Sequence, residues 1–250
     1  MKISIITIAF NSEETIEDTI KSVIAQDYDD VEYIIIDGGS TDGTLKIIEK
    51  YEDKIAKVVS EPDKGIYDAM NKGVRASTGE LIGILNSDDF YASETVLSEI
   101  AQAIGDNDSI YADLVYVDRE NTEKVVRYWK AGEYKEDCFF KGWMPPHPTF
   151  FLRKRLYDKY GDYNLKLKSA ADYELMLRML HKYRISVAYL PKVITKMRVG
   201  GQSNVTLKNR LKANKEDRMA WELNGLEPKF YSLYLKPARK ITQFLKTRGI

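Results

Sequence analysis

The sequence predicts an α/β fold: a mostly parallel, Rossmann-like sheet with helices on both faces, a small antiparallel excursion and a helical C-terminus. Three observations predict it. Short apolar runs alternate with amphipathic segments over roughly the first hundred residues, polar residues follow these runs, and two further β-like runs lie close together in the second half. Strands that alternate with helices form parallel sheets, because each helix carries the chain back across the sheet.

The first half supplies a series of alternating strands and helices. Residues 3–9 form the first strand, and Asn11 and Ser12 are candidate N-caps of the helix that follows. That helix carries Ile16 and Ile20 on one face, which is the spacing expected for packing on a sheet. The other strands are expected at 31–36, at 57–60 and in the run that ends at Asn86, and the other helices around 45–48 and over 66–76.

The second half has a different pattern. Ser109 to Val117 and Val125 to Trp129 are expected to form the antiparallel excursion. Further along we expect a strand over 149–152, a helix over 170–180, a strand near 185–190, and a polar loop at 200–203 that leads into helical segments.

Composition limits the class of protein. The 250 residues suffice for one elaborated α/β domain, and 38 basic against 38 acidic side chains argue against a nucleic-acid partner. Cys138 is the only cysteine, so no intramolecular disulfide is expected and a reducing compartment is indicated. The N-terminal apolar run is too short to span a membrane and lacks a signal-peptide cleavage site. We therefore expect a cytoplasmic protein.

Two adjacent carboxylates end the apolar run 81–85, in the sequence Asn86-Ser87-Asp88-Asp89. Such carboxylates repel each other, so a divalent cation that also holds phosphate oxygens is one interpretation. The other is the start of a helix, because Asp and Ser are common N-caps and Thr95-Val96 follow closely. Local pattern leaves both open.

Polar residues at three strand ends are expected to line one crevice: Ala9-Phe10-Asn11, Asp37-Gly38-Gly39 and Asn86 to Asp89. The chain has neither a G-x-G-x-x-G fingerprint nor a G-x-x-x-x-G-K-[ST] phosphate loop, so those modes of nucleotide binding lose support. Asp37 is placed to accept hydrogen bonds from a base or ribose, but Asp-Gly is also a common turn, and the local pattern somewhat favours the turn.

Four segments together resemble the family 2 glycosyltransferases of the GT-A fold over roughly residues 1–200: ISIITIAFN at 3–11, IDGGSTDGT at 36–44, SEPDKGIYDAMNKG at 60–73 and LNSDD at 85–89. The combination is far more specific than any one motif. The resemblance implies a nucleotide-sugar donor, a divalent metal (Mn²⁺ or Mg²⁺) and inversion at the anomeric carbon. The donor-binding residues that it implies are Phe10, Asn11, Asp37, Asp63, Lys64, Tyr67, Asn86 and Asp88.

The resemblance also implies metal ligands. Asp88 is the expected direct ligand, with Asp89 close by and His147 near the donor phosphates or the metal. Asn86 replaces the first Asp of the family's D-x-D pattern, so the residues carry less charge and we expect the metal to be held jointly with the donor diphosphate. A structural role for His147 in its proline-rich loop is the alternative.

A catalytic base is implied at Asp172, near the start of the helix predicted over 170–180. Many relatives have Glu-Asp there, whereas this chain has Ala171-Asp172, so the role falls to Asp172. An Asp is ionised at neutral pH and ready to take a proton from the acceptor hydroxyl. Without the resemblance, a simple interaction with the helix dipole would be the better interpretation, and Glu174 is the rival carboxylate.

We therefore expect an inverting transferase that moves a sugar, from a UDP sugar, to a saccharide or lipid-linked saccharide in cell-surface polysaccharide synthesis. A polyprenyl-phosphate glycosyltransferase and a non-catalytic nucleotide-sugar-binding module stay open as alternatives. The expected organisation is a domain over 1–200, with a nucleotide-sugar-binding half (1–105) and an acceptor half (106–200), and a helical extension over 201–250. Aromatic and cationic residues over 229–248 suggest either a helix that caps the domain, slightly favoured, or peripheral contact with the inner face of the membrane.

Overall fold

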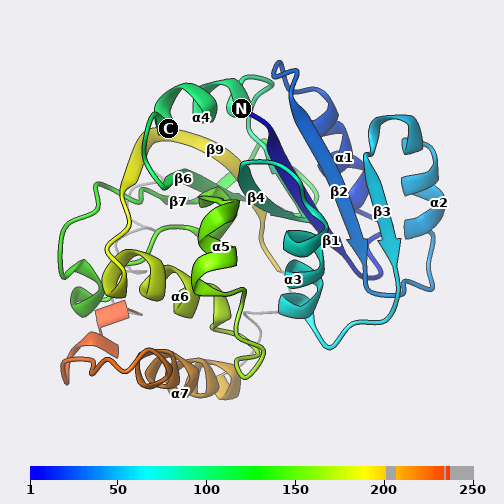
Figure 1. Cartoon of the computed structure of the whole chain (residues 1–250). Coiled ribbons are helices and arrows are strands. Elements are labelled where there is room, and N and C mark those ends of the chain that lie inside the picture. Colours follow the sequence, from blue (N-terminus) through cyan, green and yellow to red (C-terminus); the bar gives the residue numbers. More distant parts are fainter. Residues whose placement is uncertain (201–206, 234, 237–250) are drawn as a thin grey trace.

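The computed structural model describes residues 1–200, 207–233 and 235–236. Within that part of the chain, one sheet holds nine strands, in the order β3-β2-β1-β4-β8-β6-β9-β5 with β7 paired to β6 (Figure 1). The strands are β1 (Ile3–Ala9), β2 (Val31–Asp37), β3 (Lys57–Ser60), β4 (Leu81–Asn86), β5 (Asp89–Tyr91), β6 (Ser109–Val117), β7 (Val125–Trp129), β8 (Phe151–Arg153) and β9 (Val187–Arg198).

The first half of the sheet is parallel and the second half is mixed. Strands β3, β2, β1 and β4 all run in one direction, and β6 and β9 are parallel to each other. Strand β8 is antiparallel to both β4 and β6. Strand β7 pairs antiparallel with β6, and β5 pairs antiparallel with β9. The predicted fold class, with its antiparallel excursion at 109–117 and 125–129, is therefore confirmed.

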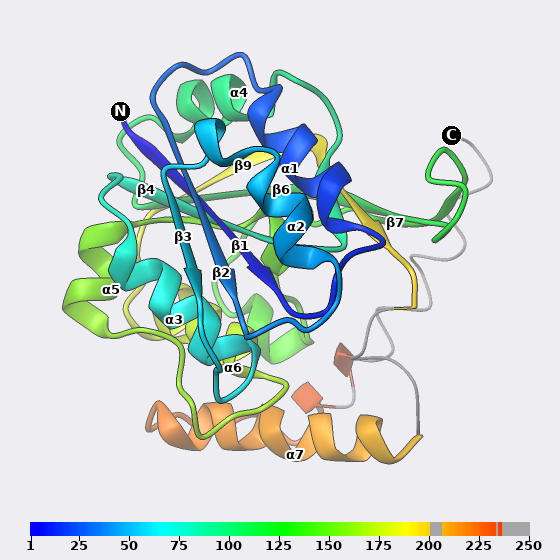
Figure 2. The ribbon, with the colours of Figure 1, turned by 90° about the vertical axis from the view of Figure 1, so that its right-hand side faces the viewer.

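Helices cover both faces of the sheet. They do so because the strands carry apolar side chains on both faces. Ile3 and Ile5 pack toward α1 (Ile16–Ile24), α2 (Thr44–Glu49) and α4 (Val96–Ile104). Ile6 and Ile8 pack toward α3 (Ile66–Ala76), α5 (Lys154–Tyr160) and α6 (Ala171–Met176). Helix α7 (Leu207–Leu223) lies outside α6 (Figures 1 and 2) and adds Trp221 to the same core. Each such apolar side chain contributes roughly 1.5–3 kcal/mol by its burial.

Neither of two candidate helix starts is found. The first helix begins at Ile16 after Thr15, and Asn11 and Ser12 do not cap it with their side chains, although the Ser12 carbonyl accepts bonds from the Thr15 and Ile16 amides. Asp88 and Asp89 do not start a helix either, because Asp89 begins β5 and α4 begins only after Thr95.

Several boundaries differ in the second half. The strand expected over 149–152 starts at Phe151, because a tight 3-10 turn occupies His147–Thr149. The α-helix expected over 170–180 ends at Met176 and continues as a π-helical turn, Leu177–Lys182. The last strand runs on to Arg198, past Pro191, because the register with β6 shifts beside Ala112 and accommodates the proline. Strand β5 and helix α5 were not predicted.

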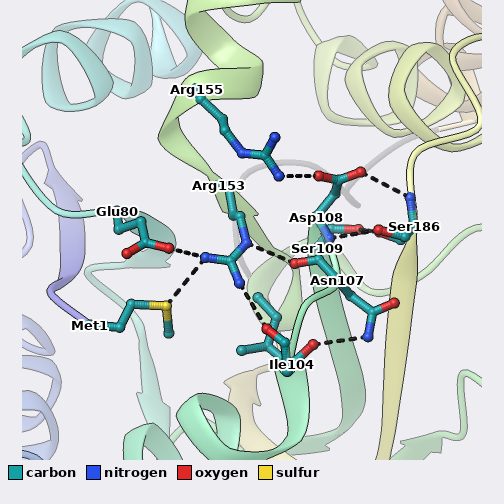
Figure 3. Close-up of polar contacts among 10 residues, drawn as sticks. Met1, Glu80, Ile104, Asn107, Asp108, Ser109, Arg153, Arg155 and Ser186 are labelled. Atoms are coloured by element: carbon teal, nitrogen blue, oxygen red, sulfur yellow. Dashed lines mark hydrogen bonds and ion pairs between the residues drawn. The ribbon is translucent and has the colours of Figure 1, made fainter.

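A cluster of polar side chains stabilises one side of the sheet (Figure 3). This side lies opposite the strand ends that carry the predicted site. Arg153 of β8 donates to the carbonyls of Gly105 and Asn107, both at 2.8 Å, and forms an ion pair with Glu80 just before β4. The Arg153 side chain therefore ties the end of α4 to the beginning of β4, two segments far apart in the sequence.

The C-terminal expectations are met only in part. Helix α7 confirms the predicted helical character of the C-terminal region, while the predicted division into domains stays a prediction. Residues 201–206, 234 and 237–250 lie outside the described residues, and with them most of the 200–203 loop and of the stretch for which membrane contact was considered. Among the described residues, no helix is both long enough and apolar enough to span a membrane.

Candidate active site

The carboxyl ends of four parallel strands meet at one edge of the sheet. Ala9 at the end of β1 pairs with Asp37, and Ile8 pairs with Asn86 at the end of β4. Asp37 in turn pairs with Ser60, the last residue of β3. In an open α/β sheet this edge is where ligands bind, so the polar residues after these strands form the candidate site.

Asp37 is fully buried and organises the loop that follows it. Its Oδ2 accepts bonds from the amides of Gly39 (3.1 Å) and Ser40 (3.0 Å) and from Ser60 Oγ (2.7 Å). Its Oδ1 accepts from Ser40 Oγ at 2.5 Å. The carboxylate is thus engaged within the protein, as in the turn interpretation, and its contact with a nucleoside stays a prediction.

An exposed ring and a carboxylate lie side by side above Gly38. A Cβ at position 38 would lie 2.4 Å from Asp63 Oδ2 and 3.4 Å from Phe10 Cδ2, so a larger residue there would displace the Asp63 side chain. The Phe10 side chain is 55% exposed, although it follows a buried strand. An open aromatic face beside a hydrogen-bond acceptor is suited to a heterocyclic base, which stacks and donates at its edge.

Hydrogen bonds fix the end of the loop between β3 and α3 where it enters the helix. Asp63 Oδ1 accepts from the amide of Gly65 at 2.7 Å, and Asp68 accepts from the amide of Lys64 at 3.0 Å. Gly65 has a φ of 113°, a conformation that favours glycine and starts α3 abruptly. The Lys64 side chain is exposed at the tip, where a cation is available to an anionic ligand.

Helix α1 fixes the turn after β4. The Thr19 hydroxyl lies 2.7 Å from the Asp89 carbonyl oxygen and 3.0 Å from that of Ser87. Ser12 Oγ lies 2.8 Å from Ser87 Oγ. Asn86 then donates from Nδ2 to Asp89 Oδ2 at 3.1 Å, while Asn86 Oδ1 and Asp89 Oδ1 are buried without a partner.

These orphaned oxygens fit a cation. Burial raises the pKa of Asp89 well above its usual value, and the charge of Asp88 adds to the effect. Burial also raises the pKa of Asp88, although Arg119 and Arg198 oppose that change. Buried oxygens without partners are rare, and carboxylate and amide oxygens are the ligands that hard divalent ions prefer. Asn86, Asp88 and Asp89 therefore suit Mg²⁺ or Mn²⁺.

The residues do not form a complete protein cage for a metal. Within the described ranges, no group of three or more His, Cys, Asp and Glu side chains is placed to hold an ion. A cation bound there would need further oxygens from a ligand or water, and their supply by a donor diphosphate stays a prediction.

His147 lies in a buried aromatic cluster. Its Nε2 is 2.8 Å from the Tyr163 hydroxyl, and the ring meets Tyr163 edge-on. Burial lowers the pKa of His147, and the negative charge of Asp172 partly opposes this, so the imidazole is neutral at pH 7. The structure therefore relates His147 to Asp172 through this cluster, and metal ligation by His147 stays a prediction.

Asp172 lies in the first turn of α6 and is half-buried. Its Oδ1 accepts a hydrogen bond from the Tyr67 hydroxyl at 3.0 Å. The rival carboxylate, Glu174, is only 2% exposed and accepts from Arg178 (3.0 Å) and Asn224 (3.0 Å). Glu174 is committed to the core, which leaves Asp172 as the available carboxylate on this helix.

Sequence reasoning missed residues that support the site from a distance. Glu216 of α7 accepts bonds from the amides of Lys168 and Ser169, just before α6. Arg198, at the end of β9, donates to the Asp88 carbonyl at 3.0 Å and pairs with Asp18. No local pattern could have shown these contacts, because the partners are 47 to 180 residues apart in the sequence.

Comparison with known proteins gives a family. The family model described as "Glycosyl transferase family 2" matches residues 4–163. An uncharacterized glycosyltransferase of Mycobacterium tuberculosis is 33% identical over 178 residues, which are 70% of this chain and 68% of that protein. A "PGL/p-HBAD biosynthesis glycosyltransferase" of Mycobacterium bovis is 29% identical over 205 residues, covering 80% of this chain and 78% of the relative.

Solved structures agree in fold. S. aureus TarS, crystallised with UDP, matches with a TM-score of 0.67 at 20% identity over 99% of this chain and 73% of that one. The mannosyltransferase PcManGT of Pyrobaculum calidifontis, in complex with GDP-Man and Mn²⁺, matches with a TM-score of 0.69 at 15% identity over 100% and 76%. These likenesses support the GT-A fold. Taken with the sequence match, they lead to one conclusion: the chain belongs to glycosyl transferase family 2 and is a glycosyltransferase.

Proposed function

We propose that the chain is an inverting, metal-dependent transferase that moves a sugar from a UDP sugar to a saccharide or lipid-linked saccharide of the cell surface. The observation that carries this proposal is the pair of buried, unpartnered oxygens, Asn86 Oδ1 and Asp89 Oδ1, at the edge where the strand ends meet. The proposal keeps the division into a donor half (1–105), an acceptor half (106–200) and an extension (201–250).

Two features support a nucleotide-sugar donor. The exposed Phe10 ring and the Asp63 carboxylate lie together above Gly38, and uracil both stacks and donates from its imide N–H. Two structural neighbours were solved in complex with UDP and with GDP-Man, which supports a nucleotide-sugar donor for this chain.

The metal would be held by Asp88, Asp89 and Asn86 together with the diphosphate oxygens. Bound there, a divalent cation would neutralise charge on the departing diphosphate. The PcManGT complex contains Mn²⁺, which supports the use of a divalent cation.

Asp172 would act as the general base. It takes the proton of the acceptor hydroxyl while that oxygen attacks the anomeric carbon and the bond to the diphosphate breaks, its electron pair leaving with the phosphate. One displacement inverts the anomeric centre and needs no covalent enzyme intermediate. General base catalysis accelerates a reaction by a factor of about 10²–10⁴.

The acceptor is proposed from the relatives. One is named for PGL/p-HBAD biosynthesis, and another, 35% identical over 118 residues, is named cholesterol galactosyltransferase. The second name specifies a lipid, cholesterol, and this supports an acceptor that carries a lipid. Product analysis with a lipid-linked saccharide and with a polyprenyl phosphate distinguishes the two acceptor classes.

A thermal-shift screen of nucleotide sugars, with and without Mn²⁺, tests the donor site. A UDP sugar should raise the melting temperature only when Mn²⁺ is present, because the metal would complete the donor site and stabilisation grows with the ligand concentration relative to Kd. If other nucleotide sugars raise the melting temperature and UDP sugars do not, the proposed donor class is wrong.

Asp172→Asn tests the base. The melting temperature of the variant should still rise with a UDP sugar, and its transfer rate should fall by a factor of about 10²–10⁴. Asp158→Asn, an exposed carboxylate on α5, is the matched control and should transfer normally. Transfer by Asp172→Asn at the wild-type rate would remove Asp172 from the mechanism.

A further inference from the structure

Tyr67 joins the donor loop to the proposed base. Its hydroxyl donates to Asp172 Oδ1 at 3.0 Å, across 105 residues of sequence. Tyr67 is the second residue of α3, directly after the loop that carries Asp63 and Lys64. The hydroxyl is therefore attached to the segment that would hold the donor, and it touches the carboxylate that would activate the acceptor.

The Tyr67 ring is fixed from behind. It is 8% exposed and stacks on Tyr163, with centroids 5.8 Å apart and planes at 17°. Two hydrogen bonds, at 2.8 and 2.9 Å, join the backbone of Tyr163 to the side chain of Asn71, which lies on α3 like Tyr67. The Tyr163 hydroxyl also lies 2.8 Å from His147 Nε2. With the ring fixed, the phenolic oxygen is held beside Asp172.

Tyr67 stays a donor throughout the working range of pH. Burial raises the pKa of its phenol far above the usual value, and the charge of Asp172 adds to that rise. A neutral phenol has a single proton, and here that proton is directed at Asp172 Oδ1.

We propose that Tyr67 is a positioning residue for the transfer reaction: it holds Asp172 by Oδ1, leaves Oδ2 for the acceptor hydroxyl, and couples the orientation of the base to the donor loop through α3. This inference rests on the proposed function, because it assumes that Asp172 is the base. It assigns a role to Tyr67 different from stacking on the donor.

Two consequences separate positioning from a structural role. A carboxylate that loses a donated hydrogen bond holds its proton more tightly, so the acid limb of the pH–rate profile moves to higher pH. A carboxylate free to rotate is also less often aligned for proton transfer, so kcat falls while donor affinity does not.

Tyr67→Phe tests this, since it keeps the ring that stacks on Tyr163. We expect kcat for transfer to fall about tenfold to a hundredfold, the acid limb to move to higher pH, and KM for the donor and the UDP-sugar thermal shift to stay as in the wild type. Tyr163→Phe is the matched control: it removes the hydroxyl that meets His147 but leaves the Tyr67 hydroxyl on Asp172. Its acid limb should lie at the wild-type pH.

The outcomes separate the inference from the proposed function. If Asp172→Asn transfers normally, the base assignment fails and this inference fails with it. If Asp172→Asn is inactive but Tyr67→Phe keeps the wild-type kcat and acid limb, only the positioning role is overturned. An equal movement of the acid limb in Tyr163→Phe would also overturn it, because the effect would then belong to the aromatic cluster as a whole.

Discussion

Asn86 Nδ2 donates to Asp89 Oδ2 at 3.1 Å, so the amide supplies a hydrogen to a buried carboxyl in the turn after β4. This bond is one reason why the chain tolerates two neighbouring carboxyl groups with raised pKa values at the end of a buried strand. An aspartate at position 86 would offer no hydrogen and would add a third negative charge.

Asn86→Asp should therefore lower stability without metal and increase the response to metal. We expect the melting temperature in EDTA to fall by several degrees, because like charges oppose one another in a buried site, and the rise on adding Mn²⁺ to exceed that of the wild type. Differential scanning fluorimetry at several Mn²⁺ concentrations measures both. A variant with an unchanged Mn²⁺ response would show that position 86 is not beside the metal.

Glu216 of α7 should control how well the base is held. Its carboxylate accepts from the Lys168 amide (3.0 Å) and from the Ser169 amide and hydroxyl (2.7 and 2.9 Å), three residues before Asp172. Glu216→Ala removes the acceptor of these partly buried hydrogen bonds, and a hydrogen bond typically contributes about 0.5–1.5 kcal/mol to stability. We expect a lower melting temperature and a fall in kcat that exceeds any change in the donor KM.

Glu222→Ala, an exposed site on the same helix, is the control for Glu216. It should leave both stability and kcat close to the wild type. Equal losses in the two variants would point to a general weakening of α7 and not to the contact with residues 168–169.

Arg153 and Arg155 form a natural pair for comparing a partly buried with an exposed ion pair (Figure 3). The Arg153 side chain is 11% exposed and bonds to two carbonyls as well as Glu80, whereas that of Arg155 is 64% exposed and pairs with Asp108. Arg153→Met should lower the free energy of unfolding by about 2–4 kcal/mol and Arg155→Met by less than about 1 kcal/mol. Urea unfolding of both variants measures the difference. Losses of similar size would contradict the proposed role of Arg153 at the end of α4.

Glu32 should make folding sensitive to acid. Burial would raise its pKa, but hydrogen bonds from Ser4, Thr78 and Lys2 outweigh that effect and lower the pKa from about 4.5 to about 2. A lowered pKa means that the folded state favours the ionised group. The stability contributed by Glu32 is therefore fully present above about pH 4.5 and is lost as the pH falls toward 2.

Glu32→Gln tests this pH dependence. The free energy of unfolding should fall less steeply between pH 4.5 and 2 in the variant than in the wild type, and the variant should be less stable at neutral pH. Glu49→Gln, at an exposed position at the end of α2, should keep the wild-type slope. Parallel curves for Glu32→Gln and the wild type would contradict the assignment.

The regular elements of the first half could be predicted because their signals are local. Strands β1 and β3 and helix α3 have the expected bounds, and β2 extends one residue further, to Asp37. The errors fall where distant contacts override local pattern. Strand β9 passes Pro191 because pairing with β6 stabilises it on the far side, and the short β5 exists because it pairs with β9.

The candidate site could be predicted in position but not in chemistry. Sequence alone placed polar residues after β1, β2 and β4, and parallel pairing brings those strand ends together. It could not show that the Asp37 carboxylate accepts hydrogen bonds from Ser40 and Ser60, or that Glu174 accepts them from Arg178. Side-chain hydrogen bonding depends on three-dimensional neighbours, and these carry no periodic signal.

The sequence by itself determined the family, the alternation of strands and helices, and the strand ends at which the site lies, because motifs and hydrophobic periodicity are properties of neighbouring residues. The tertiary structure decided which polar atoms remain available for chemistry. Asn86 Oδ1 and Asp89 Oδ1 are left without partners, and Asp172 is held by Tyr67 from 105 residues away. A buried oxygen is free or engaged only according to what the fold places beside it, and that depends on the packing of the whole chain.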